Sequence, residues 1–343
     1  MYKRQVLQMI SADEYQAYGT TLINFAEKIS SFSSPLAVGM SGNFRQMKRR
    51  ILNIAVFRKE TLYQKMRALI IYLVISAVFI GCTPILSIDA STQNVYHFSD
   101  TDKNISLLDI SETFGTYDGS FVLYDNNLDS WKIYDLEEAT KRIPPESTYK
   151  IYDALLGLES GIITPEHSSM TWNGDAFPFP SWEADQDLNS AMQNSVNWYF
   201  QAIDSQLGIN RVQGFLNKIE YGNQTTSSNL DLYWSDFSLK ISPLEQVTLL
   251  KKFNTNEFHL NFQNVFSVKN AIKIASTPNG NFYGKTGTGR VNGQDINGWF
   301  IGYVETSDNS YYFATNIQSD SNATGKKAFE ITSDILKKLH IWN

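Results

Sequence analysis

One serine and one lysine in the chain are spaced as covalent catalysis would require. Ser147 and Lys150 stand three residues apart in "STYK", just after Pro144-Pro145 and at the start of an apolar, helix-like run. Residues three apart share a face of a helix, so the lysine amine can reach the serine hydroxyl. Serine becomes a good nucleophile only when a neighbouring base accepts its proton. S-x-x-K occurs once in this chain, but it also fits an ordinary helix start.

A second and weaker motif is "SVN", which runs from Ser195 to Asn197 in a segment with a helical pattern. The same S-x-N pattern occurs elsewhere, for example at Ser41. Only the position of Ser195, between the first motif and the third, favours a functional interpretation.

The third motif, "KTG", lies in the strand-like run "NFYGKTGTG". Lys285 and Thr286 offer a cation and a hydroxyl that can hold a substrate carboxylate. The backbone N–H of Thr288 can point at an oxyanion, and Gly287 lets a ligand approach the backbone closely. The alternative is a glycine-rich edge strand with a surface lysine. In the order S-x-x-K, S-x-N, K-T-G, the three motifs match the penicillin-recognising serine acyltransferases.

The pattern around these motifs predicts the elements that must position them. "SFVLYD" and "SWKIYDL" read as a hairpin closed by "NNLD". Residues 147–275 read as helices with loops; residues 242–253, for instance, start with a capping serine and a first-turn proline. Strands return after Pro278, and the chain ends in a helix at about 325–340. This order predicts an α/β fold in which helices flank a mixed, mainly antiparallel sheet that carries a helical subdomain.

The charge pattern predicts a membrane protein. The chain of 343 residues has a net charge of −6, which gives no nucleic-acid footprint. Residues 68–88 carry no charge over 21 positions, and roughly 20 apolar helical residues cross a bilayer. The preceding stretch, residues 45–67, is strongly basic. The positive-inside rule then places residues 1–67 in the cytoplasm and residues 89–343 outside the cell membrane.

A different interpretation of the same segment stays open. A signal sequence starting at Met66 would end at Cys82, which would then carry a lipid. Cys82 is the only cysteine, so no disulfide can form within the chain. Both interpretations place the C-terminal part outside the membrane.

Residues from about 105 to 343 resemble class D (OXA-type) β-lactamases and, more closely, the sensor domains of BlaR/MecR-type β-lactam signal transducers. The resemblance rests on the three motifs and on "FVLYD", "SVNWYF", "YGN", "LKISPLEQ", "YGKTGTG" and "NGWFIGYVE". Residues 1–88 resemble the end of the transducer's membrane module, with residues 31–55 as the marker. The resemblance therefore implies a cytoplasmic remnant at 1–67, a transmembrane helix at 68–88, a linker at 89–104 and a penicillin-binding sensor domain at 105–343.

The resemblance also implies roles for single residues. Ser147 would be acylated by the β-lactam, and Lys150, as an N-carboxylated lysine formed with carbon dioxide, would be its base. Ser195 would pass a proton towards the leaving nitrogen. Lys285, Thr286 and Gly287 would form the carboxylate-binding strand, and the N–H groups of Ser147 and Thr288 the oxyanion hole.

Two aromatic residues complete the implied site. Trp234 would donate its indole N–H to the lysine carbamate. Tyr221, the tyrosine of "YGN", would line the cleft, although a packed core tyrosine is an equally good interpretation.

Asn197 departs from the hydrolysing class D enzymes, which usually carry an apolar residue at that position. An amide there can hydrogen-bond to Lys150 and compete with the carbamate. Without the carbamate the acyl-enzyme would lose the base that deacylation needs, and it would persist. This departure favours a β-lactam sensor, which transduces its acylation to induce resistance; the alternative is a membrane-anchored class D β-lactamase. A cell-wall transpeptidase is a third interpretation.

Two features of the resemblance have no counterpart in the sequence. Class D enzymes often bind the substrate carboxylate with an arginine downstream of K-T-G, but no arginine follows Arg290 here. Lys285 and Thr286 must therefore bind the carboxylate with at most some help from Lys326 or Lys327. The four histidines do not form the H-E-x-x-H motif of the transducers' zinc peptidase, so no zinc site is expected on this chain. We therefore expect a fragment whose metalloprotease module is missing, or a protein that signals through a separate cytoplasmic regulatory partner.

Overall fold

The computed structural model describes residues 11, 14–30, 63, 66–67, 69–72, 94–99, 101 and 103–343. The chain divides into two units, residues 1–85 and 86–343. In the first unit, α2 runs from Glu14 to Ser30. Ahead of this helix, the backbone N–H and the hydroxyl of Ser11 both donate to the Glu14 carboxylate at 2.8 Å.

The predicted membrane helix at 68–88 falls almost wholly outside the described residues. Of this stretch, residues 69–72 are described and are helical. Within the described part of the chain, no helix combines the length and the apolar character that crossing a membrane requires. The span therefore stays a prediction.

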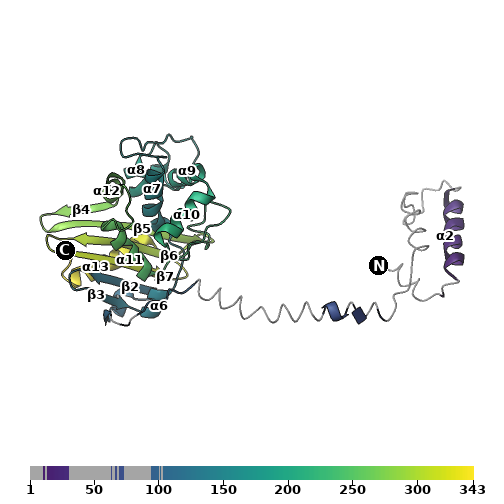
Figure 1. Cartoon of the computed structure of the whole chain (residues 1–343), viewed down its shortest axis with the longest axis horizontal. Coiled ribbons are helices and arrows are strands. Elements are labelled where there is room, and N and C mark those ends of the chain that lie inside the picture. Colours follow the sequence, from purple (N-terminus) through teal and green to yellow (C-terminus); the bar gives the residue numbers. More distant parts are fainter. Residues whose placement is uncertain are drawn as a thin grey trace. The chain divides into compact units, whose positions relative to one another are not determined.

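The second unit is built on one seven-stranded sheet in the order β1-β3-β2-β7-β6-β5-β4 (Figure 1). The strands are β1 (Asn104–Leu107), β2 (Asp118–Asp125), β3 (Ser130–Tyr134), β4 (Lys273–Thr277), β5 (Gly280–Val291), β6 (Gln294–Glu305) and β7 (Ser310–Gln318). Every pair in the sheet is antiparallel except β1 with β3. The predicted α/β fold with a mixed sheet is confirmed, as are the hairpin β2–β3 and the three returning strands.

Two clusters of buried side chains pack against this sheet. The smaller cluster holds β2, β5, β6 and β7 against α5 (Ser111–Phe114) and α13 (Gly325–Lys338), with Phe300 and Ile331 among its members. The larger cluster joins other residues of the same strands to the helices inserted between β3 and β4. The sheet is thus covered by helices, and its central strands β6 and β7 are almost fully buried.

The inserted helices form the predicted helical subdomain, and α7, α8 and α9 gather together beside the sheet in Figure 1. The helices of the insertion are α6 (Leu136–Thr140), η1 (Glu146–Tyr149), α7 (Lys150–Glu159), η2 (Pro180–Trp182), α8 (Leu188–Gln193), α9 (Asn197–Leu207), α10 (Ile209–Ile219), α11 (Pro243–Asn254) and α12 (Phe262–Ala271).

Local sequence explains where α11 begins. Ser242 accepts from the Glu245 backbone N–H while the Glu245 carboxylate accepts from Ser242, which is a complete capping box with Pro243 in the first turn. The helix then crosses the sheet and contacts β2, β6 and β7. On its other side, Gln246 donates to the Thr148 hydroxyl at 3.0 Å, so α11 ties the sheet to η1.

Candidate active site

Ser147 and Lys150 meet across the junction between η1 and α7. The chain enters η1 through Pro145, whose carbonyl accepts from the Thr148 hydroxyl. A tight 3-10 turn running directly into an α-helix brings residues three apart onto one side. The Lys150 Nζ consequently lies 2.8 Å from the Ser147 Oγ, as the spacing of the motif predicts.

The Lys150 amine is buried, with 1% of the residue exposed. Burial lowers its pKa to about 7, although the carboxyl groups of Asp153 and Glu146 act in the opposite direction. A large fraction of the lysine is therefore uncharged at neutral pH. An uncharged amine 2.8 Å from a hydroxyl is able to accept its proton, which is what a serine nucleophile requires.

Asn197 is the first residue of α9, and its side chain reaches the same amine. The Lys150 Nζ donates to the Asn197 Oδ1 at 2.7 Å. The rings of Phe200 and Trp234 each lie 5.6 Å from the Nζ. The amine thus sits in a largely apolar pocket in which Asn197 and Ser147 are its hydrogen-bond partners among the described residues.

Ser195 and Lys285 form a second serine–lysine pair beside the first. Ser195 has a left-handed backbone (φ 54°) in the short turn between α8 and α9. Its hydroxyl accepts a hydrogen bond from the Lys285 Nζ, which also donates to the Thr286 carbonyl at 3.0 Å. Lys285 is 5% exposed, and burial, followed by repulsion from Lys150, holds its pKa well below the usual value for lysine. The three motifs therefore converge on one site.

The KTG strand β5 runs directly against η1. A Cβ added to Gly287 would lie 3.1 Å from the Pro145 oxygen and 3.3 Å from the Ser147 nitrogen. This approach leaves little room for a side chain at Gly287. It also brings the backbone of Ser147 next to the strand that carries Thr288, where the oxyanion hole is predicted.

The end of β5 is joined to α13. The Gly325 N–H donates to the Thr288 hydroxyl at 2.8 Å, and a Cβ on Gly325 would lie 2.6 Å from the Gly287 oxygen. Of the two lysines proposed to assist at this end, Lys327 pairs with Glu330 at 3.4 Å on the exposed side of the helix.

The two predicted aromatic residues lie beneath the site. Trp234 is 2% exposed, and its backbone carbonyl accepts from the Glu146 N–H at 3.1 Å. Tyr221 is fully buried and packs edge-on against Tyr149 and Tyr152. The burial of Tyr221 favours the packed core tyrosine over the residue that lines a cleft. Its contact with the site passes through Tyr149, next to Lys150.

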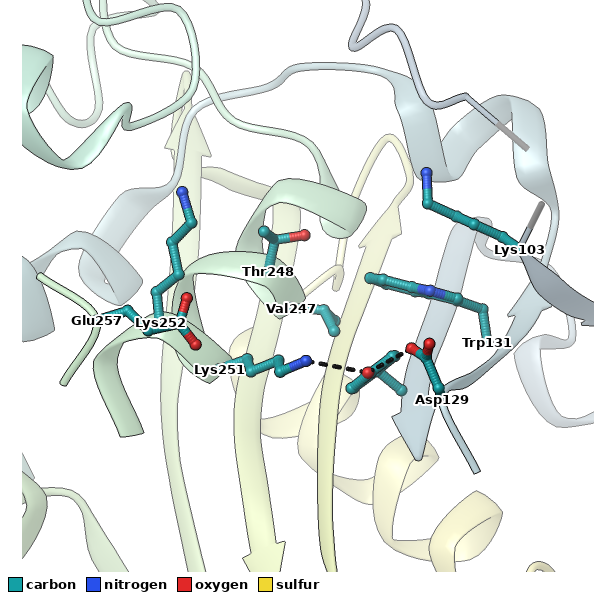
Figure 2. Close-up of a pocket in the computed structure, with 9 residues that line it drawn as sticks. Lys103, Asp129, Trp131, Val247, Thr248, Lys251, Lys252 and Glu257 are labelled. Carbon is teal, nitrogen blue, oxygen red and sulfur yellow. Dashed lines mark hydrogen bonds between the residues drawn. The ribbon is translucent and has the colours of Figure 1, made fainter. Parts of the chain in front are cut away.

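A separate cavity of about 300 Å³ lies between α11 and the β2–β3 edge of the sheet (Figure 2). It contains none of the predicted site residues. Its lining residues are Lys103, Tyr124, Asp129, Trp131, Val247, Thr248, Lys251, Lys252 and Glu257. The chemistry of the three motifs and this cavity therefore belong to different places in the fold.

Comparison with known proteins identifies the family. Residues 116–337 match the family described as the penicillin binding protein transpeptidase domain. The chain belongs to that family. It is 41% identical over 98% of its length to the regulatory protein BlaR1 of Bacillus licheniformis, of which it spans 56%. The chain therefore covers little more than half the length of this relative.

Two solved structures are similar to the second unit. The C-terminal domain of the Bacillus licheniformis BlaR penicillin-receptor is similar with a TM-score of 0.69 and 45% identity, covering 71% of this chain and 99% of that domain. The class D beta-lactamase BAT-2 is similar with a TM-score of 0.65 and 36% identity, covering 69% of this chain and 97% of the enzyme. The resemblance to class D enzymes and BlaR-type receptors is thus confirmed.

Four residues of the site were not predicted from the sequence. Phe200 packs over the Lys150 amine, and Asp153 acts on its pKa. Asp153 follows Lys150 by three residues, so helical spacing alone places it on the same side. Glu146 and Asn297 lie 151 positions apart and meet only through the pairing of β5 and β6 against η1.

Proposed function

We propose that this protein is an extracellular β-lactam sensor that is acylated on Ser147 by penicillins and cephalosporins and transmits the signal across the membrane to induce β-lactam resistance. The family and the similarity to a BlaR1 regulator and a penicillin-receptor domain support the proposal. The single observation that supports the proposal best is the hydrogen bond between Lys150 and Asn197, because this bond affects how long the acyl group remains on Ser147.

Acylation follows from the geometry of the two serine–lysine pairs. Lys150 accepts the proton of Ser147, and the freed Oγ attacks the β-lactam carbonyl. The developing oxyanion is stabilised by the N–H groups of Ser147 and Thr288. Ser195 passes a proton to the ring nitrogen as the C–N bond breaks, and the proton that Lys150 took from Ser147 replaces it. The product is an ester on Ser147 with the opened ring attached.

Deacylation requires a base that activates water. A carbamate on Lys150 would supply such a base, and the buried, partly uncharged amine is the kind of group that reacts with carbon dioxide. Asn197 Oδ1, however, accepts a hydrogen bond from this amine at 2.7 Å. A carbamate would need the space and the donor that Asn197 uses. We infer that Asn197 shifts the balance towards the free amine after acylation, so that the ester persists.

The membrane arrangement belongs to the same proposal. Residues 1–67 form the cytoplasmic remnant of a membrane module, residues 68–88 cross the cell membrane once, residues 89–104 link, and residues 105–343 form the sensor outside. The 21 uncharged positions with a basic stretch on one side support this orientation. The signal would pass to a cytoplasmic regulatory partner or to a metalloprotease module that this sequence does not contain.

A membrane-anchored class D β-lactamase is the second candidate, favoured by the similarity to BAT-2. Intact-mass measurement of the full chain in detergent, followed over time after one penicillin addition, separates the two. A sensor gives a stoichiometric adduct that lasts for hours. Steady turnover at about 1 to 1000 per second would overturn the sensor and establish the hydrolase. A lipid thioether on Cys82 would contradict the single span.

A further inference from the structure

Glu146, the residue before the nucleophile, has an unusual backbone. Its φ is 52°, in the left-handed region that residues with a Cβ rarely occupy. Such a conformation persists where the surrounding contacts determine it, and it concentrates at functional sites. Glu146 is also 6% exposed, although its side chain is a carboxylic acid. A buried glutamate in a strained backbone directly before Ser147 therefore calls for a physical explanation.

A network of hydrogen bonds fixes Glu146 and the chain just before it. Its carboxyl Oε1 accepts from the Asn297 Nδ2 at 3.3 Å, and the same amide donates to the Pro144 carbonyl at 3.1 Å. Trp299 Nε1 also donates to the Pro144 carbonyl, at 2.8 Å. Asn297 is itself held by Asn316, which donates to its Oδ1 at 2.8 Å. The central strands β6 and β7 thus hold Pro144 and Glu146, close before Ser147.

The Glu146 side chain also fills a notch that the glycines of β5 leave. A Cβ on Gly289 would overlap the Glu146 Oε1, and a Cβ on Gly287 would lie 3.1 Å from the Glu146 Cβ. The glycines of "KTGTG" therefore accommodate Glu146 as well as any ligand. With this packing, the Ser147 nitrogen lies 3.3 Å from the position of that Gly287 Cβ, directly against the strand.

Burial sets the charge of this carboxyl group. It raises the pKa of Glu146 to about 8, against the opposing effects of the Asn297 hydrogen bond and the positive charge of Lys150. Lys150 of α7 faces it from one side. A cavity of about 70 Å³ borders it on the other and is also lined by Arg290 of β5, whose guanidinium pairs with Asp295 of β6 at 2.7 Å. At neutral pH the acid is mostly uncharged.

We propose that Glu146 is a positioning residue whose neutral carboxyl group holds the Ser147 N–H against β5, where it forms the oxyanion site with Thr288. This rests on the proposed acylation of Ser147. Ionised, the same group places a negative charge beside a developing oxyanion, which repels it. A carboxylate there also favours the ammonium form of Lys150, and so removes the base. Both effects slow acylation.

The test compares Glu146→Gln and Glu146→Ala with the wild-type full chain in detergent, and Glu137→Gln on the exposed side of α6 serves as the control. Acylation by a chromogenic cephalosporin is followed from pH 6 to 9.5, and the rate of the acylation step is separated from the prior binding constant. Wild type and the control should lose rate below about pH 7, as Lys150 gains a proton, and again above about pH 8, as Glu146 ionises.

Glu146→Gln retains an uncharged side chain of the same shape. It should match wild type at pH 7 within about twofold and keep its rate above pH 8. Glu146→Ala loses the side chain, so its acylation step should slow by about 100-fold, with little change in the binding constant. A purely structural role of Glu146 would not change the loss of rate above pH 8. This measurement also does not depend on whether the alanine variant folds.

Two results overturn the inference: an alkaline decline in Glu146→Gln equal to that of wild type, or a folded Glu146→Ala variant with wild-type acylation. Either would leave the acylation of Ser147 in place, because wild type would still be labelled. Wild type that is not acylated at any pH would instead overturn the proposed function, and the inference with it.

Discussion

Two regions of this protein are lined by lysines, and they differ in how far those lysines are buried. In the candidate active site, Lys150 and Lys285 are 1% and 5% exposed, and burial lowers the pKa of both. In the cavity of Figure 2, the Lys251 ammonium donates to the Tyr124 hydroxyl at 3.0 Å. Burial opposes its charge, but this hydrogen bond and the electrostatic effects of Tyr124, Glu257 and Asp129 together outweigh burial and raise the pKa of Lys251.

The other lysines of the cavity keep conventional partners near the surface. Lys252 pairs with Glu220 at 3.0 Å, and Lys103 lies 4.1 Å from the centre of the Phe98 ring. Figure 2 shows Lys103 and Lys252 on opposite sides of the cavity with Thr248 between them. The comparison teaches that an open cavity and several cations do not by themselves make a reactive site. The reactive lysines are those that the fold removes from water and places against a hydroxyl group.

The strongest test of this contrast removes the nucleophile. Ser147→Ala should abolish covalent labelling by penicillin because, among the residues that the structure describes, no other hydroxyl is hydrogen-bonded to Lys150 as its base. Gel fluorescence with a labelled penicillin measures this, with Thr248→Ala in the Figure 2 cavity as the matched control. Labelling that survives in Ser147→Ala would show that the site has been assigned to the wrong serine.

The next test compares lysine with lysine. Lys150→Ala should slow acylation by about 10²–10⁴-fold, the usual contribution of a general base. Lys251→Ala, from the Figure 2 cavity, should leave the rate unchanged. Stopped-flow measurement of acylation with both variants decides the matter, and equal losses in the two would end the distinction between the regions.

A third test changes the partner of the buried amine. Asn197→Val removes the amide that bonds to Lys150 and restores an apolar neighbour. We expect faster deacylation, by up to about 100-fold, because a carbamate on Lys150 can then act as the base. Intact-mass decay of the penicillin adduct with and without added bicarbonate measures the change. A decay rate equal to that of wild type in both conditions would remove Asn197 from the explanation of a persistent ester.

The smallest expected effect concerns stability. Asp153 and Asp204 are both fully buried beneath Lys150. Burial raises the pKa of Asp204 to about 8, and burial together with Asp204 raises that of Asp153. A carboxyl group with a raised pKa in the folded state stabilises fully below its unfolded pKa near 4, and this stabilisation is lost as pH rises towards the folded value.

The free energy of unfolding should therefore fall between pH 4 and pH 7, by up to about 1.4 kcal/mol per pH unit for each such carboxyl group. Asp204→Asn should make this decline less steep, whereas Glu257→Gln at the exposed cavity should leave it unchanged. Urea unfolding at a series of pH values measures both. A wild-type free energy that is flat or rising over this range would contradict the burial of protonated acids beneath the site.

Sequence alone was sufficient for the features that depend on short-range patterns. The spacing of Ser147 and Lys150 foretold their hydrogen bond, because residues three apart in a helical segment are neighbours. The capping signal at Ser242 marked the start of α11. Short strand-like runs bounded by turn residues located β2, β3, β5, β6 and β7, and hence the α/β fold, because turn residues mark the ends of each strand locally.

Other features were not visible in the sequence because they arise from pairing between distant segments. No strand was predicted at β1 (Asn104–Leu107), which begins at the last residue of the predicted linker and pairs in parallel with β3; such pairing leaves little local pattern. The sequence did not decide whether Tyr221 lines the cleft or packs in the core, and the structure packs it against Tyr149 and Tyr152. The partnership of Glu146 with Asn297 depends on how η1 lies across β5 and β6.

The sequence by itself thus determined which residues are capable of the chemistry, namely two serines and two lysines on three motifs in a fixed order. Only the tertiary structure decided that Ser195 pairs with Lys285, that the two pairs share one site, and that the Lys150 amine is buried enough to lose charge near neutral pH. The physical reason is that spacing is encoded locally, whereas the desolvation of an amine depends on every element packed around it.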